Sequence, residues 1–113
     1  MSKTTTLPAS LIETLTSTIR AEAEAKHAQY PQYAGHWDGW GLVQVTRRVK
    51  TKMGEAFKKG EIALGKRDEP VVDSALHPDT LAELNKPSYT VYSRSTGYDT
   101  LVRANNVVEV SAA

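Results

Sequence analysis

Hydrophobic and polar residues alternate through the middle of the chain, which is the pattern of β-strands with one buried face. Within Gly54–Asp68 a turn, Lys58-Lys59-Gly60, is followed by a segment in which Ile62 and Leu64 share one face. Glycine at position 60 can adopt the backbone angles that a sharp reversal needs. The segment therefore predicts a tight turn followed by a buried strand.

Residues 42–53 alternate in the same way and predict a second strand. Its apolar face would carry Val43, Val45, Val49 and Met53, with Arg47 as an exception. The opposite face would carry Gln44, Thr46, Arg48, Lys50 and Lys52. One face of this strand is therefore expected to be solvated and basic.

A helix is predicted near the N-terminus, over residues 10–30, after a frayed segment at residues 1–9. Leu11, Leu15, Ile19 and Ala23 recur at a spacing of four and form one apolar stripe that would dock on the rest of the protein. Ser10-Leu11-Ile12-Glu13 has the form of a capping box. Pro8 could instead begin the helix two residues earlier. Tyr30-Pro31 ends it, because proline disfavours the α conformation of the preceding residue.

Aromatic residues and glycines are concentrated in residues 30–41, YPQYAGHWDGWG, which hold both tryptophans, Trp37 and Trp40. Glycines allow this segment to bend sharply, so we expect a loop. One interpretation is that its aromatic side chains close one end of the core. The other is a binding surface, since Trp and Tyr often supply interface energy.

Prolines interrupt the β pattern in residues 69–87, where His77-Pro78-Asp79 predicts the start of a short helix. We expect an insertion folded against the side of the sheet, with Leu76, Leu81 and Leu84 facing inward. Two strands joined by the turn Ser95-Thr96-Gly97, a helical turn at 103–106 and a last strand at 107–110 complete the chain. The predicted core is Phe57, Ile62, Leu64, Val91, Val102 and Val107, with Leu15 and Ile19 docked on it.

Two stretches of this pattern resemble the SH3-like small β-barrel. The first is Phe57–Leu64, FKKGEIAL, a turn that leads into a buried strand. The second is Leu101–Val110, LVRANNVVEV, with a short helical turn before a final strand. The resemblance covers residues 42–68 and 88–110. It implies one domain, mainly β, in which residues 31–113 form a five-stranded barrel with a helical insertion at 69–87.

The resemblance also implies which ligand is absent. SH3 domains that bind Pro-rich peptides usually have a proline where Arg103 stands and a tyrosine where Asn106 stands. Tyr89 replaces the usual tryptophan at the start of the third strand, and the first long loop, TRRVKTKMGE, is basic rather than acidic. We therefore expect no binding of Pro-rich peptides.

Charge is unevenly distributed, although the net charge is only +1. Residues 41–67 hold eight Lys or Arg and two acidic residues, so this region can attract an anionic partner. The chain has no cysteine, and no apolar run is long enough for a signal peptide or a membrane span. A soluble cytoplasmic protein is the expectation.

Catalytic and metal-binding patterns are missing. The three histidines, His27, His36 and His77, do not form spaced pairs, and no phosphate-binding loop or nucleophile motif occurs. Asp68 and Glu69 at a strand end are interpreted as solvated loop residues. The sequence therefore predicts no catalytic residue, no metal site and no cofactor.

The remaining hypotheses are two kinds of binding module. The first is a small cytoplasmic protein-interaction or accessory protein, with self-association included and an origin in a phage or plasmid suggested by size and composition. The alternative is a nucleic-acid-binding barrel that uses basic strands and stacking aromatics. The candidate binding residues are Arg48, Lys50, Lys52, Lys58, Lys59, Trp37 and Trp40. An alternative explanation of these cations, without a binding role, is an edge strand whose lysines keep it soluble.

Overall fold

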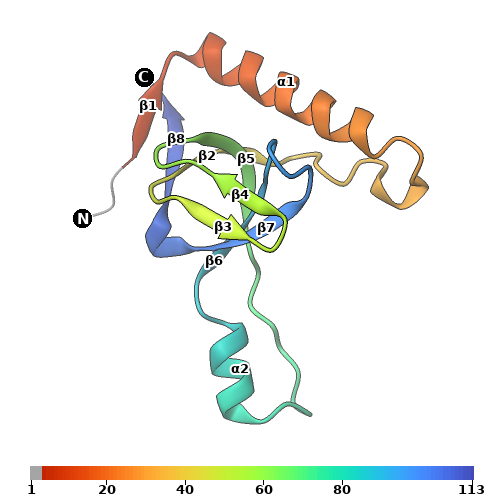
Figure 1. The fold of residues 1–113 in the computed structure, drawn as a ribbon. Coiled ribbons are helices and arrows are strands. Elements are labelled where there is room, and N and C mark those ends of the chain that lie inside the picture. The colour runs from red at the N-terminus through yellow and green to blue at the C-terminus, as the bar shows by residue number, and fades with distance from the viewer. Residues whose placement is uncertain (1–3) are drawn as a thin grey trace.

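A computed structural model describes residues 4–113 and contains a long helix, a short helix and eight strands (Figure 1). The helices are α1 (Ala9–Lys26) and α2 (Pro78–Leu84), with 3₁₀ turns at Pro31–Tyr33 and Ala104–Asn106. The strands are β1 (Thr5–Leu7), β2 (Gly41–Val45), β3 (Val49–Thr51), β4 (Gly54–Phe57), β5 (Ile62–Arg67), β6 (Ser88–Tyr92), β7 (Asp99–Arg103) and β8 (Val107–Ala112). The predicted N-terminal helix and β-rich body are present, but residues 4–113 form eight strands instead of the five predicted.

Six of the strands form one sheet in the order β1-β8-β2-β5-β6-β7. β1 runs parallel to β8, and the other neighbours are antiparallel. β3 and β4 form a separate hairpin that lies in front of this sheet in Figure 1. Within residues 4–113 no ladder joins β7 to β1 or β8, so hydrogen bonding does not close the sheet into a barrel.

The predicted continuous strand 42–53 is wrong. β2 ends at Val45, the chain bends at Thr46–Arg48, and β3 begins at Val49. Thr46 N–H bonds to the carbonyl of Asn106, which directs the chain away from the sheet after β2. Met53 lies in the hairpin turn with 61% of its surface exposed, and is not on a buried face.

The sheet is buried on both faces. An inner cluster contains Val43, Val45, Ala56, Phe57, Ala63, Tyr89, Val91 and Val102. A helix-side cluster contains Ile19, Ala23, Trp37, Trp40, Leu42, Leu64 and Tyr92. Ala63 and Leu64 are neighbours in β5 that belong to different clusters, and both are fully buried. β5 is therefore a central strand between two layers, which its alternation alone did not predict.

The predicted core residues Phe57, Leu64, Val91 and Val102 are buried, whereas Ile62 and Val107 are half-buried at the cluster edges. Leu64 packs toward α1 and not with the inner cluster. Burial of large apolar side chains is the main source of stability in a domain of this size. The two clusters therefore fix α1 to one face of the sheet and the β3–β4 hairpin to the other.

Helix α1 docks through Ile19 and Ala23, which are fully buried, and through the half-buried Leu15. Its N-cap is Pro8, whose carbonyl accepts from Leu11 N–H and Ile12 N–H, so the capping box at Ser10 is wrong and the start near Pro8 is confirmed. The helix ends at Lys26, short of Tyr30, and His27 is its C-cap.

The interpretation of residues 1–9 as frayed is wrong for Thr5–Leu7. These residues form β1, which pairs with β8 in the register Thr5↔Val110 and Leu7↔Ala112. Residues 1–3 lie outside the described part of the chain. β1 leads directly into α1, so the start of the helix is fixed next to the end of the sheet (Figure 1).

The segment between β5 and β6 forms an arm, residues 68–87, that extends away from the sheet and ends in α2 (Figure 1). The predicted helix after His77 is confirmed, but its docking on the sheet is wrong: α2 buries no residue, and Leu84 is 52% exposed. Neither helix of residues 4–113 combines the length and the apolarity needed to cross a membrane.

Candidate binding surfaces

The β3–β4 hairpin presents two of the predicted binding residues, Lys50 and Lys52, and Arg48 directly precedes it. Its turn is held by the Thr51 hydroxyl, which accepts from Met53 N–H and donates to the carbonyl of Gly54. Gly54 has a φ of +112°, which glycine adopts readily and other residues rarely do. Lys50 in β3 and Lys52 in the turn are both exposed, so they project from an ordered hairpin.

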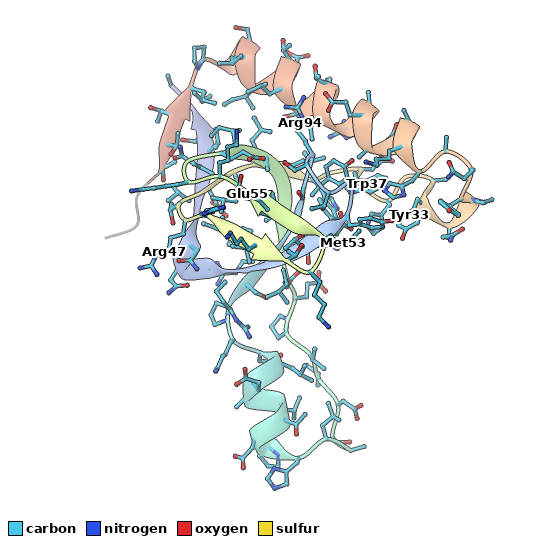
Figure 2. The ribbon with its side chains drawn as sticks, in the orientation of Figure 1. Tyr33, Trp37, Arg47, Met53, Glu55 and Arg94 are labelled. Carbon is cyan, nitrogen blue, oxygen red and sulfur yellow. The ribbon has the colours of Figure 1, made fainter. Side chains whose placement is uncertain are left out.

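Glu55 divides the predicted basic face. It lies opposite Lys50 in the register of the hairpin, and it accepts a hydrogen bond from the guanidinium of Arg48. The Glu55 carboxylate therefore pairs with Arg48 and places a negative charge across the hairpin from Lys50, with which it forms no ion pair. Figure 2 labels Glu55, which lies in β4, and Arg47, which lies in the bend before β3. This face is consequently less uniformly positive than the sequence pattern alone predicted.

Lys58 and Lys59 lie on the next turn. Its geometry is fixed because Gly60, with a φ of +85°, donates from N–H to the carbonyl of Val45, and Lys58 N–H binds the carboxylate of Glu61. Both ammonium groups remain exposed. Among the described residues, no carboxylate lies within ion-pair distance of five exposed cations: Arg47, Lys50, Lys52, Lys58 and Lys59. We call these five residues and Arg48 the basic hairpin surface.

Lys66 and Arg67 belong to a different region, because they are the last two residues of β5, whereas Lys58 and Lys59 precede its first residue. The Lys66 ammonium lies 5.7 Å from the centre of the Trp40 ring, a cation–π geometry. Sequence proximity had grouped all of these cations, but the strand places them at opposite ends.

Trp37 and Trp40 are buried, with 1% and 5% of their surfaces exposed. The Trp37 ring meets Tyr92 nearly edge-on at 5.5 Å and stacks on Tyr33 at 5.7 Å. These contacts fit the interpretation that the aromatic loop closes the core. Neither tryptophan offers an open face on which a nucleic-acid base could stack.

Asp99 in β7 anchors the aromatic loop and was missed by sequence reasoning. Its carboxylate accepts from Trp37 Nε1 at 3.0 Å and lies 2.7 Å from His36 Nε2. A third long-range hydrogen bond joins the end of α1 to the turn before β7, because Nε2 of the buried His27 donates to the carbonyl of Gly97 at 2.7 Å. No local pattern could have identified these partners, since more than 60 positions separate each pair.

The side-chain amide of Asn85 links the two ends of the arm through a pair of hydrogen bonds to the backbone of Val71. Asn85 Oδ1 accepts from Val71 N–H at 2.6 Å, and Asn85 Nδ2 donates to the carbonyl of Val71 at 3.0 Å. Val72 and Leu84 remain exposed. The Lys86 ammonium donates a hydrogen bond to the Glu83 carboxylate, and this bond and the positive charge lower the pKa of the Glu83 carboxyl.

Polar groups that could serve in catalysis have structural partners. The Ser93 hydroxyl donates to the carbonyl of Ala56, and the Asp68 carboxylate accepts from the hydroxyls of Ser88 and Thr90. Asp68 is thus a structural acceptor and not the solvated residue that the sequence suggested. Within residues 4–113 no three His, Asp or Glu side chains gather in a way that could hold a metal ion.

Comparisons with family models, with curated proteins and with solved structures found no match to this chain.

Proposed function

We propose that this chain is a non-enzymatic binding module, a small accessory protein of the cytoplasm, whose partner is a protein with an acidic surface. The supporting observation is the basic hairpin surface, in which five exposed cations have no carboxylate partner among the described residues. Exposed charges of one sign steer an oppositely charged surface into contact and align it. Trp37 and Trp40 have no part in the proposed contact, because they are buried.

The strand order supports assigning the body to the SH3-like barrels. The five strands β8-β2-β5-β6-β7 are neighbours in that order, the β3–β4 hairpin connects β2 to β5, and a 3₁₀ turn lies between β7 and β8. These are the elements expected from the resemblance. An experimental structure in which β7 and β8 diverge on either side of the 3₁₀ turn that joins them would contradict the assignment to the SH3-like barrels.

Pro-rich peptides are not the proposed ligand. Arg103 replaces the usual proline and lies 3.6 Å from Glu83 at the base of the arm, so this part of the surface is charged. Titration with a PxxP peptide should give no saturable change in tryptophan fluorescence. Micromolar binding that is lost in Tyr89→Leu would contradict this proposal.

Two double variants with the same change in net charge test the proposed surface. Lys50→Glu/Lys52→Glu should abolish capture of the partner from a lysate of the source cell, and Lys66→Glu/Arg67→Glu should leave it intact. Arg48 is left unchanged because it is paired with Glu55 and so is not one of the five cations without a carboxylate partner. Equal capture by both variants, with unchanged circular dichroism, would place the site elsewhere.

Nucleic acid is the second candidate, because unpaired cations also suit phosphate. The two candidates differ in salt dependence: phosphate contacts would make the logarithm of the affinity fall steeply with the logarithm of salt concentration. Binding of random duplex DNA with a steep slope, lost in Lys50→Glu/Lys52→Glu, would favour this alternative. The buried tryptophans count against single-strand stacking.

Self-association is a third outcome of the same experiments. The arm is acidic, with five acidic residues and one lysine in residues 68–87, so the arm of a second copy could occupy the basic hairpin surface. Sedimentation at low and high salt would detect this. A dimer at low salt that is lost in Lys50→Glu/Lys52→Glu would identify the second copy as the partner.

A further inference from the structure

A cavity of about 330 Å³ lies where α1 ends and the aromatic loop begins. Its lining comes from one short stretch of chain, from Glu24 in the last turns of α1 to Asp38 in the loop. Figure 2 labels Tyr33 and Trp37 at this end of the molecule, under the end of α1. The cavity shares no residue with the basic hairpin surface.

Aromatic rings form adjoining walls of this cavity. The Tyr30 and Tyr33 rings meet at 73° with their centres 6.2 Å apart, and the His27 ring lies 4.8 Å from Tyr33. Tyr30 is 46% exposed, so its ring is accessible from solvent. Aromatic faces carry negative electrostatic potential, and several of them together attract a poorly hydrated cation.

The charged groups of the cavity have the sign that suits a cation. Glu24 and Asp38 are both in the lining, which contains no Lys or Arg. Neither carboxylate has an ion-pair partner among the described residues. The nearby Lys26 side chain lies against Gly97 instead, where it would touch any Cβ added at that position. Two carboxylates and several rings therefore surround a space without a protein cation.

The cavity walls are held in place before any ligand arrives. Successive tight turns link Tyr33 N–H to the carbonyl of Tyr30 and His36 N–H to that of Tyr33, each at 3.0 Å. His27 is fixed by its bond to Gly97, and Tyr33 stacks on the buried Trp37. A preformed cavity binds with a smaller loss of conformational entropy than one that must be ordered.

We propose that this cavity binds an alkylated ammonium group, carried either by a free small molecule or by a methylated lysine side chain. The methyl groups would contact the rings of Tyr30 and Tyr33, and the positive charge would face the carboxylates of Glu24 and Asp38. An acetate or phosphate ion would be repelled by the same carboxylates. This proposal stands independently of the basic hairpin surface.

The test is an NMR titration of the ¹⁵N-labelled full chain. Choline and Nα-acetyl-trimethyllysine amide are the two cationic probes, and 3,3-dimethylbutan-1-ol is the neutral probe with nearly the shape of choline. The cations should shift the amide signals of Tyr30, Tyr33 and Gly35 and the indole signal of Trp37 with saturation at millimolar concentration, and the alcohol should not. Tighter binding of either cation identifies its source and supports the proposal.

Matched variants locate the site. Tyr30→Leu and, separately, Glu24→Gln/Asp38→Asn should each weaken choline binding by about tenfold, since each removes one kind of attraction. Tyr98→Leu is the control, because Tyr98 is similarly exposed and adjoins His27 without lining the cavity. Equal binding of the alcohol, no saturation with either cation, or unchanged affinity in the first two variants would overturn the proposal.

Discussion

Trp37 and Asp99 are joined by a hydrogen bond of 3.0 Å from the indole nitrogen to the carboxylate, although 62 positions separate them in the chain. The other oxygen of the same carboxylate lies 2.7 Å from His36 Nε2. One side chain of β7 therefore fixes two successive residues of the aromatic loop. Because the loop is also part of the helix-side cluster, this carboxylate connects the edge of the sheet to the core.

The Asp99 carboxylate is predicted to contribute measurably to stability. Asp99→Ala would leave the buried Trp37 N–H without an acceptor, which costs about 1–3 kcal/mol. Asp99→Asn keeps an acceptor oxygen and should cost less. Urea denaturation monitored by tryptophan fluorescence measures both. Equal stability of Asp99→Ala and the wild type would show that the loop is held by packing alone.

Docking of α1 is predicted to depend on Ile19. Ile19→Ala removes a fully buried side chain from the helix-side cluster and should lower the free energy of unfolding by about 2–5 kcal/mol. Leu11→Ala is the matched control in the same helix, since Leu11 is 41% exposed. Thermal or urea unfolding compares the two. Similar losses in both variants would contradict the docking of α1 through Ile19.

The Asn85 side chain is predicted to order the arm without stabilising the body. Asn85→Ala removes both bonds to Val71, so amide exchange at Val71 and proteolysis within residues 68–87 should accelerate. The free energy of global unfolding should change by less than about 0.5 kcal/mol, since no residue of α2 is buried. Thr80→Ala in α2 is the control. Unchanged exchange at Val71 would refute the role of Asn85.

The protein is predicted to lose stability at alkaline pH because of the Tyr89 hydroxyl. Burial, followed by its hydrogen bond to Glu109, raises the pKa of the Tyr89 hydroxyl above its value in the unfolded chain. The folded state therefore holds this proton more tightly, and the resulting stability is complete below the unfolded pKa of about 10 and declines as pH rises through the folded value. Tyr89→Phe should show a shallower decline in urea midpoint above this pH. Parallel curves for the two proteins would contradict the assignment.

Alternation along the sequence located the central strands because it reports local exposure. Phe57, Val91 and Val102 are in the inner cluster as predicted. The same signal missed the break after Val45, because four positions separate Val45 from Val49 and the parity of the pattern survives the bend. Periodicity records which residues share a parity, and it contains no information on whether the strand between them is continuous.

The candidate surfaces were predictable only in part, for the same physical reason. The run of cations in residues 41–67 is visible in the sequence, but the pairing of Arg48 with Glu55 depends on the register of a hairpin. The burial of Trp37 depends on α1, β6 and β7 meeting around it. The cavity beside Tyr30 depends on the angle between rings that successive turns impose. Each of these is a tertiary relation that local composition does not contain.

The pairing of β1 with β8 has a consequence for folding kinetics. Thr5 pairs with Val110, so this ladder closes a loop of nearly the whole chain. Contacts between distant positions form slowly because the entropy of closing the loop is lost before the contact is gained. We expect β1 to join the sheet last, and α1 to lie loosely on its face until then. During that interval the apolar stripe of α1 would be the part of the chain most open to aggregation or to a chaperone.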